Sequence, residues 1–370
     1  MNSSNTLYKG LMALSGLMLL VVLGMILTGN GASAGVPLIL FFASAALGVR
    51  GFENVSGFGF TIWVFAAVSW AMYFPDMIRD VNGYNTEGLI VPLIQVIMFG
   101  MGTSMSLGDF AGVIKMPKGV LVGVICQFTI MPLIGVSIAI VFGFPAEIAA
   151  GVVLIGSSPS GVASNVMAYL AKGNLALSVT LTAVATLMAP IMTPFLMQTF
   201  AGQFVPIEFV PMMISIVKMI IIPIAAGLLF NYIFKGKAEW LHKAMPAISM
   251  AGIVIIIAVI TASGRDHLLT IGLLLVMAAI LHNGFGYIFG YWGCRLVGMN
   301  VRDSRTIAIE VGLQNGGMAS GIAVELGRTA TMGLAPAVFG PWMNISGSFL
   351  ANWWRDNPPK DGSYVEEEEA

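Results

Sequence analysis

The sequence predicts an all-α integral membrane protein of about twelve transmembrane helices, in which two inverted repeats of five helices follow an extra N-terminal pair. Three observations carry this prediction. The 370 residues are 57% hydrophobic and only 9% charged, whereas soluble domains carry about 25% charged residues. Apolar runs of spanning length fill most of the chain. Two of these runs are interrupted by polar residues, at matching positions in the two halves.

Charge, cysteine content and motifs exclude several classes of protein. The net charge is −1 and no basic cluster is present, so we expect no nucleic-acid partner. Cys126 and Cys294 each lie in an apolar run, where packing is expected rather than a disulfide scaffold. His282 lies in a span beside Asn283, and a structural histidine is favoured there over a proton relay. Hydrolase and metalloprotease motifs are absent from the sequence, so we expect no enzyme.

Hydrophobic runs separated by charged or Gly/Pro-rich gaps define the expected spans. In order they are Tyr8–Leu27, Val36–Val49, Phe58–Tyr73, Leu89–Met105, Gly119–Phe142, Ala146–Ala171, Leu175–Phe200, Phe209–Phe234, Ala244–Thr261, Leu268–Val297, Arg305–Glu325 and Ala330–Trp354. The second run has fourteen residues, which is short for a complete span. None of the runs alternates as a transmembrane strand does, so no strand is expected.

The N-terminal run raises the question of a cleaved signal. Lys9, the apolar run and Ala32-Ser33-Ala34 together resemble a signal peptide with its cleavage site. The apolar run Leu11–Leu27 exceeds the usual signal core of about 7–15 residues and is long enough to span. We therefore expect the first helix to be retained.

The basic residues indicate which side of the membrane each loop faces. With the N-terminus inside, thirteen of the seventeen Lys and Arg residues fall in inner segments, and the outer loops hold only Arg79, Arg265 and Arg328. Cytoplasmic loops carry the excess of Lys and Arg. We therefore expect a multi-pass protein of the cell (inner) membrane with both termini cytoplasmic. The one remaining basic residue, Lys218, lies within a span.

These spans divide the chain into four parts. Residues 1–57 are expected to form an extra helical hairpin, 58–200 the first repeat, 209–354 the second repeat and 355–370 a disordered acidic cytoplasmic tail. Because each repeat has an odd number of spans, the second enters the membrane from the opposite side. Transporters of this layout bind their substrates near the membrane midplane, where discontinuous helices meet.

The fourth span of each repeat is the interrupted one. The first contains Gly156–Asn165, where Pro159 lies among glycines and small polar residues that do not hold a regular helix in lipid. The second, Thr306–Glu325, contains Glu310, two amides and several glycines. A charge at the bilayer centre costs about 2.5–3.5 kcal/mol on insertion scales, so one that persists there faces a cavity, an ion or a partner. The two breaks therefore predict a transport site.

Oxygen ligands around Glu310 would suit a hard cation such as Na⁺. The candidate metal ligands are Glu310, Gln127 and Gln314, together with Ser164, Asn165, Ser178, Thr182 and carbonyls freed where the helices unwind. Two simpler interpretations compete with this one. Hydroxyls in membrane helices often bond their own i−4 carbonyl, and Glu310 could form a buried pair with Lys218. The N–H groups at broken helix ends favour an anionic substrate.

Ordered motifs along the chain resemble the bile acid:sodium symporter family, including its bacterial members. They are F-G-M-G (Phe99–Gly102), C-Q-F-T-I-M-P (Cys126–Pro132), A-S-N-V-M-A-Y-L-A-K-G-N (Ala163–Asn174), S-I-V-K-M (Ser215–Met219), L-H-N-G (Leu281–Gly284), E-V-G-L-Q-N (Glu310–Asn315) and N-I-S-G-S (Asn344–Ser348). The resemblance covers roughly residues 58–354. It implies a ten-helix fold with a panel domain and a core domain, whose fourth and ninth helices unwind and cross at the two breaks.

The resemblance also implies two Na⁺ sites and a substrate region. The first ion site would comprise Ser164, Asn165, Ser178, Thr182 and Glu310, and the second Gln127, Glu310 and Gln314 with the carbonyls of Val311 and Leu313. Substrate contacts would fall on Asn165, Asn315 and Asn344. Val162 and Met343 stand where bacterial relatives often have Thr and His, so the substrate is expected to differ from theirs. The N-terminal hairpin is an addition to the ten-helix plan.

The function expected from these features is sodium-coupled import of an organic anion, such as a bile acid or a small carboxylate, by alternating access. Two classes of alternative remain open. One keeps the fold and makes Glu310 a proton carrier. The other is a channel or a ligand sensor that does not transport. The sequence indicates a lipid-bilayer environment and leaves open which anion is carried and whether the protein forms a homodimer.

Overall fold

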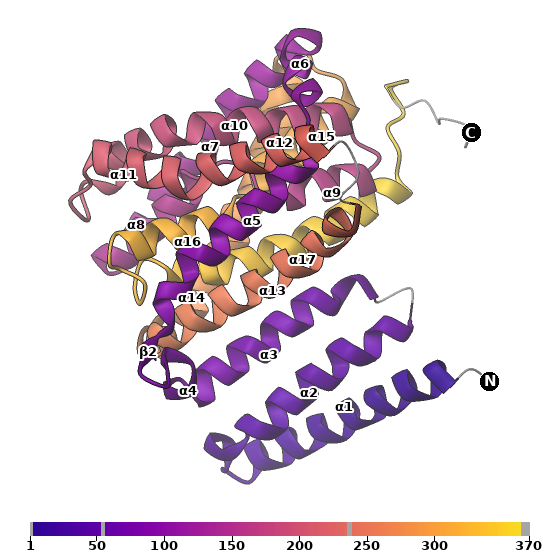
Figure 1. The fold of residues 1–370 in the computed structure, drawn as a ribbon, viewed down its shortest axis with the longest axis vertical. Helices are drawn as coiled ribbons and strands as arrows, with labels where there is room; N and C mark the ends of the chain where they lie inside the picture. The colour runs from indigo at the N-terminus through magenta and orange to yellow at the C-terminus, as the bar shows by residue number, and fades with distance from the viewer. Residues whose placement is uncertain (1–2, 53–55, 235–238, 364–370) are drawn as a thin grey trace.

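The computed structural model describes residues 3–52, 56–234 and 239–363. It is helical almost throughout, as the sequence predicts (Figure 1). In the first half the helices are α1 (Ser3–Leu27), α2 (Gly35–Gly48), α3 (Gly59–Tyr73), α4 (Asp76–Arg79), α5 (Ile90–Ser104), α6 (Leu107–Lys115), α7 (Pro117–Val141), α8 (Ala146–Gly156), α9 (Ala163–Leu170) and α10 (Leu175–Leu196).

The second half continues in the same way. Its helices are α11 (Phe209–Ile216), α12 (Ile222–Phe234), α13 (Glu239–Ser263), α14 (Arg265–Leu296), α15 (Val301–Gly312), α16 (Gly316–Glu325) and α17 (Leu334–Asp356). A π-helical turn, Val217–Ile221, lies between α11 and α12 and carries Lys218. Seven of the helices among the described residues are long and apolar enough to cross a membrane. Of the other expected spans, two are shorter helices (α2 and α3), two are paired half-helices, and one is the 23-residue α17, which is not among the seven. The count of twelve therefore stays a prediction.

The prediction that the chain needs no strand is wrong at one loop. Asp80–Val81 (β1) pairs antiparallel with Tyr84–Asn85 (β2). The connecting residues Asn82 and Gly83 have φ angles of +56° and +82°, as a two-residue hairpin turn of type I′ requires. Asn and Gly are the residues that adopt such angles most readily. This hairpin is too short to alter the all-helical class.

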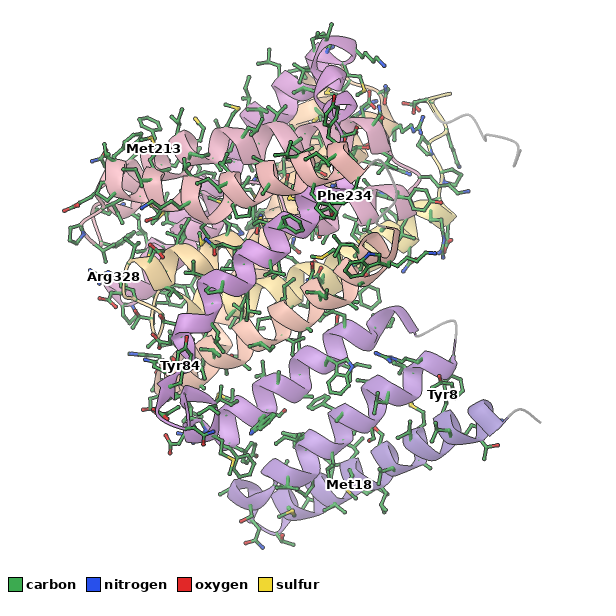
Figure 2. The ribbon with its side chains drawn as sticks, in the orientation of Figure 1. Tyr8, Met18, Tyr84, Met213, Phe234 and Arg328 are labelled. Carbon is green, nitrogen blue, oxygen red and sulfur yellow. The ribbon has the colours of Figure 1, made fainter. Side chains whose placement is uncertain are left out.

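The N-terminal helices α1, α2 and α3 lie side by side as a layer on one flank of the molecule (Figure 1). Helix α1 packs on α2, α2 packs on α3, and α3 joins the layer to α13. The side chains of Tyr8 (Figure 2) and Met12 pack against Gly51 and Gly48, where an added Cβ atom would meet them. Most of α1 remains outside these contacts, since only 11% of the residues in its most apolar stretch are buried.

The remaining helices pack in two groups. Helix α5 contacts both α12 and α13, and α3 packs on α13. Helices α7, α8, α10, α14 and α15 form the second group, with α17 packed against α8, α9 and α14. The α5–α12 contact is close because Gly102 and Gly227 face the opposite backbone. The largest buried cluster of apolar side chains extends across both groups, and the two broken helices lie in the second.

Candidate functional site

Both predicted helix breaks are present, and they meet. Helix α8 ends at Gly156 and α9 begins at Ala163, while α15 ends at Gly312 and α16 begins at Gly316. The two breaks pair as an antiparallel bridge between Ser160 and Gln314. Unpaired backbone groups are costly in a membrane interior, and this bridge satisfies several of them.

Backbone hydrogen bonds hold the bridge together. The N–H of Gly161 donates to the carbonyl of Leu313 at 2.8 Å, and the N–H of Asn315 donates to the carbonyl of Pro159 at 2.8 Å. Gly161 allows this approach, since a Cβ there would lie 3.0 Å from the Gln314 carbonyl oxygen. The crossing of the broken helices is therefore a hydrogen-bonded unit.

Glu310 lies at the centre of a buried oxygen cluster formed by α9, α10 and α15. Its side chain has no exposed surface. The hydroxyl of Ser178 lies 2.5 Å from Oε1, and the hydroxyl of Thr182 lies 2.8 Å from Oε2. The Asn165 Oδ1 atom lies 2.8 Å from the same Ser178 hydroxyl and 3.2 Å from that of Thr182. Ser164 completes the cluster, with its Oγ atom 3.4 Å from Thr182 Oγ1.

The polar contacts of this cluster are mostly oxygen to oxygen. The hydroxyls of Ser178 and Thr182 each carry one proton. Each lies within hydrogen-bond distance of the Glu310 carboxylate and of Asn165 Oδ1. With the amide turned by 180°, the two Asn165 N–H groups would donate to both hydroxyls. In either arrangement one carboxylate lies among several neutral oxygens, a donor set that fits a small cation such as Na⁺.

A second group of polar atoms lies beside the bridge. The Gln127 amide donates to Gln314 Oε1 at 2.7 Å and to the Ser158 carbonyl at 2.9 Å. The Gln314 amide in turn donates to the Val311 carbonyl at 2.5 Å. Gln127 Oε1 is buried without a hydrogen-bond partner among the described residues. Buried acceptors of this kind are rare and require an explanation, and a cation would supply one.

The structure gathers this second set only in part. Gln127, Gln314 and Val311 lie together, as the resemblance implies. The Leu313 carbonyl is occupied by the N–H of Gly161, and Glu310 accepts its hydrogen bonds from Ser178 and Thr182. The first set of ligands is therefore the more fully assembled of the two.

The three asparagines expected to contact substrate lie on different elements. Asn165 on α9 already takes part in the oxygen cluster around Glu310. The side chain of Asn315 caps α16 by accepting from the N–H of Met318 at 2.9 Å. Asn344 on α17 donates to the Gly340 carbonyl at 3.0 Å, and Gly340 lies beside Gly316 at the start of α16. Their polar contacts run to neighbouring backbone or hydroxyl groups and not to one another.

The alternative pairing of Glu310 with Lys218 is not formed. Lys218 lies on an exposed part of the π-helical turn, while Glu310 is bonded to hydroxyls.

His282 is buried against Phe339, with 5.3 Å between ring centroids. Neither of its ring nitrogens has a hydrogen-bond partner among the described residues.

Two polar residues near the breaks were not among the predicted ligands. Ser160 is buried, and its Oγ atom lies 3.5 Å from Thr182 Oγ1. Its place inside the predicted break was a signal that could have found it. Asn283 is buried and donates to the carbonyl of Gly312 at 2.7 Å. The motif L-H-N-G includes Asn283, but only the packing of α14 on α15 shows what it binds.

The start of α8 and the end of α16 are joined by an ion pair. Arg328, which follows α16, pairs with Glu147 in the first turn of α8, and the hydroxyl of Thr331 donates to the same carboxylate. Arg328 lies at the end of the bundle where α8 begins (Figure 2). This contact fixes the start of one broken helix to the end of the other.

The end of α9 and the start of α15 have a corresponding contact. Asn174, which follows α9, donates to Asp303 in the first turn of α15 at 2.8 Å. The N–H of Asn174 also donates to the hydroxyl of Thr306 at 2.8 Å. The Glu147–Arg328 and Asp303–Asn174 contacts each join the first turn of one broken helix to residues that follow the other. This is the pattern expected of inverted repeats.

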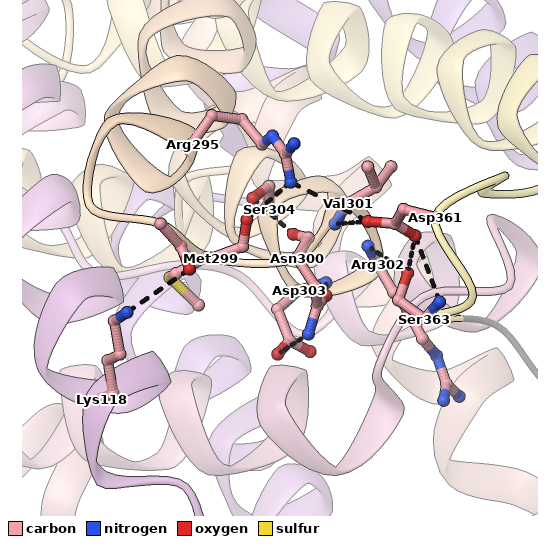
Figure 3. A network of polar contacts seen from close by, with 11 residues as sticks. Lys118, Arg295, Met299, Asn300, Val301, Arg302, Asp303, Ser304, Asp361 and Ser363 are labelled. Carbon is pink, nitrogen blue, oxygen red and sulfur yellow. Dashed lines mark hydrogen bonds and ion pairs between the residues drawn. The ribbon is translucent and has the colours of Figure 1, made fainter.

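Part of the expected disordered tail packs on the start of α15 (Figure 3). The carboxylate of Asp361 accepts from the N–H of Val301 at 2.8 Å and lies 3.9 Å from Arg295. The hydroxyl of Ser363 accepts from the N–H of Arg302 at 3.3 Å. An anion at a helix N-terminus is favourable. The acidic residues Glu366–Glu369 of the predicted tail lie outside the described residues.

Asp361→Asn is expected to loosen the start of α15. Hydrogen bonds from the Ser363 hydroxyl and the Val301 N–H lower the pKa of Asp361 below its ordinary value. Its contribution is therefore complete at neutral pH and is lost only as the pH falls through the lowered pKa. Hydrogen exchange at neutral pH should show faster exchange at Val301 and Arg302 in the variant. Asp356→Asn serves as the control, and equal exchange in all three proteins would contradict the prediction.

Comparison with known proteins places the chain among membrane transporters. A profile described as the Sodium Bile acid symporter family matches residues 91–271. The uncharacterized sodium-dependent transporter YocS of Bacillus subtilis is 39% identical over 83% of this chain and 94% of its own length. The chain belongs to the sodium bile acid symporter family. This confirms the resemblance read from the motifs.

Other members of the family are also similar to this chain. A probable chloroplastic sodium/metabolite cotransporter of Arabidopsis thaliana is 32% identical over 81% of this chain and 74% of its own length. The ileal sodium/bile acid cotransporter of Oryctolagus cuniculus is 32% identical over 62% of this chain and 67% of its own length. These relatives are named as transporters or cotransporters, so the expectation of a membrane transporter and not an enzyme is confirmed.

Gln127→Leu tests the expectation from the resemblance that there are two Na⁺ sites, and it should remove the second of them. The substitution deletes the amide that bonds Gln314 and Ser158 and leaves the hydroxyls around Glu310 unchanged. Binding of radioactive Na⁺ to the purified protein should therefore fall from two ions per chain to one. Thr129→Ala on the exposed side of α7, where the hydroxyl bonds only the Ile125 carbonyl, should keep both. Two ions bound to Gln127→Leu would exclude Gln127 as a ligand.

Proposed function

We propose that this protein is a symporter that uses the inward movement of Na⁺ to import an organic anion. The observation that carries the proposal is the buried cluster in which hydroxyl and amide groups surround the single carboxylate of Glu310. Family membership supports sodium as the coupling ion. Within the described residues no group of three or more His, Cys, Asp or Glu side chains forms a metal site. One carboxylate among neutral oxygens suits a monovalent ion.

Two Na⁺ ions bind in the proposed cycle. The first lies among Ser164, Asn165, Ser178, Thr182 and Glu310, and the second near Gln127, Gln314, Glu310 and the carbonyls of Val311 and Leu313. Each set draws on elements from both repeats, so ion binding would hold the broken helices together. Each positive charge that crosses 100 mV supplies about 2.3 kcal/mol. Two sodium ions with a monovalent anion carry one net charge, so the membrane potential assists uptake.

The substrate is an organic anion in this proposal. The starts of α9 and α16 both lie at the break, where their N–H groups and positive dipole ends favour negative charge. Asn165, Asn315 and Asn344 would add neutral polar contacts. A bile acid and a small carboxylate both satisfy this chemistry, and relatives are named for bile acids and for metabolites. Val162 and Met343 would set which of these anions fits.

The helix packing supports alternating access as the transport mechanism. Helices α3, α13, α5 and α12 pack one on the next in that order and define one group, to which we assign the panel role. The broken helices belong to the other group, to which we assign the core role. The contacts between Glu147 and Arg328 and between Asn174 and Asp303 hold the broken helices as one body. We propose that this body moves against the panel with the ions bound, in the inner membrane and with both termini in the cytoplasm.

Uptake into proteoliposomes tests the proposed function. Purified protein is reconstituted, and entry of a radiolabelled bile acid and of a short keto acid is measured with an imposed gradient of Na⁺ or of H⁺. We expect saturable uptake of one of them that an inward Na⁺ gradient stimulates. Stimulation by H⁺ alone would identify the proton-coupled alternative. Current that does not saturate would indicate a channel, and binding without uptake would indicate a sensor.

A further inference from the structure

The carboxyl end of α15 is held by a side chain from another helix. Helix α15 ends inside the protein, so its last carbonyl groups lack helical partners. The Asn283 Nδ2 atom on α14 donates to the Gly312 carbonyl at 2.7 Å, and Asn283 itself is 1% exposed. Gly312 lies between Val311 and Leu313, whose carbonyls are assigned to the second ion site. Asn283 therefore controls the backbone from which that site is built.

The orientation of Asn283 is fixed by a chain of hydrogen bonds. The Gly312 carbonyl can only accept, so the amide nitrogen of Asn283 must face it and its Oδ1 atom must face away. The hydroxyl of Ser346 on α17 donates to that Oδ1 atom at 2.5 Å. Because this uses the one Ser346 proton, the Tyr287 hydroxyl at 3.2 Å must donate to Ser346. The donor and the acceptor of each of these three hydrogen bonds are therefore fixed.

Helices α14, α15 and α17 pack closely around these hydrogen bonds. A Cβ on Gly312 would lie 2.3 Å from the Tyr287 ring, and one on Gly347 would lie 3.2 Å from the Leu313 side chain. The N–H of Gln314 also donates to the sulfur of Met343 on α17, at 3.2 Å. A displacement of the α15 end is therefore transmitted directly to α17.

We infer that Asn283 and Ser346 are positioning residues that couple the second ion site to the substrate region, an inference that rests on the proposed function. The pair touches neither the ion nor the substrate. Asn283 holds the Gly312 carbonyl and so orients the neighbouring carbonyls for Na⁺. Ser346 lies two residues from Asn344 on α17, so the ordering of the break by Na⁺ also orders the part of α17 that meets the anion.

The inference is tested by Na⁺ binding to the full-length chain, with radioactive Na⁺ as the probe. Ser346→Ala removes the donor to Asn283 and leaves a small side chain in place. Ser346→Thr keeps the hydroxyl and serves as the conservative rescue. Ser348→Ala is the matched control, because Ser348 is on the same helix and its hydroxyl contacts only the sulfur of Met167.

We expect the Na⁺ affinity of one site to fall while that of the other stays unchanged. Loss of groups that orient metal ligands typically costs about 10- to 100-fold in affinity, so Ser346→Ala should weaken one of two Na⁺ sites about 10-fold, and saturating anion should no longer raise the Na⁺ affinity as it does in the wild type. Ser346→Thr should restore both properties, and Ser348→Ala should match the wild type. Identical binding curves for Ser346→Ala and the wild type, or failure of Ser346→Thr to rescue a weakened site, would overturn the inference. Absence of any Na⁺ binding by the wild type would overturn the proposed function as well.

Discussion

Glu310→Gln is expected to abolish sodium-dependent uptake while the protein continues to fold and to insert. Glu310 is the carboxylate shared by both assigned ion sites, and its two oxygens contact the hydroxyls of Ser178 and Thr182. Glutamine has nearly the same shape but no charge, and its amide nitrogen repels a cation. We expect Na⁺ affinity to fall by about 100-fold, equivalent to about 2.8 kcal/mol.

The measurement is uptake at increasing Na⁺ concentration in proteoliposomes, with the amount of reconstituted protein determined in parallel. Glu325→Gln is the matched control, since it makes the same chemical change at an exposed position at the end of α16. The control should transport like the wild type. Full uptake by Glu310→Gln would remove Glu310 from the mechanism, and loss of uptake in both variants would point to a general defect.

Gly227→Ala is expected to cause a large loss of stability without touching the ion sites. A Cβ at this position of α12 would lie 2.2 Å from the Phe99 carbonyl oxygen on α5. The obstacle is backbone and not a flexible side chain, so the two helices must separate. Overpacking typically costs about 1–3 kcal/mol, and the rigid contact places this variant at the upper end.

Thermal unfolding in detergent measures this effect. We expect the apparent Tm of Gly227→Ala to fall by about 4 °C. The apparent Tm of Gly102→Ala should fall by a similar amount, because a Cβ there would lie 2.2 Å from the Ile224 carbonyl oxygen across the same contact. Gly16→Ala in α1 is the control, since nothing lies within 4 Å of its added Cβ. An unchanged Tm in the Gly227 and Gly102 variants would show that α5 and α12 are less closely packed.

Much of the candidate site was predictable because its signals are local. Pro159 with its flanking glycines cannot continue a helix, and Glu310 is costly in lipid wherever the chain folds. Ser178 and Thr182 are four residues apart, so they share one helix face. Asn283 was missed as a contributor for the opposite reason. An asparagine in a span has many possible local partners, and no residue near it in the sequence indicates that it binds the Gly312 carbonyl. The position of Ser160 inside the break was a local signal, but its contact with Thr182 was not predictable from the sequence.

The sequence by itself determined the membrane class, the positions of both breaks and the single carboxylate between them. These follow from hydropathy and from the cost of a charge in lipid, which act on each segment separately. The tertiary structure alone decided which oxygens surround Glu310, which groups pair at the ends of the broken helices and how Asp361 packs on α15. Contacts such as Ser178–Glu310, separated by 132 residues, depend on how helices pack, and that packing is set by side-chain shape along their whole length.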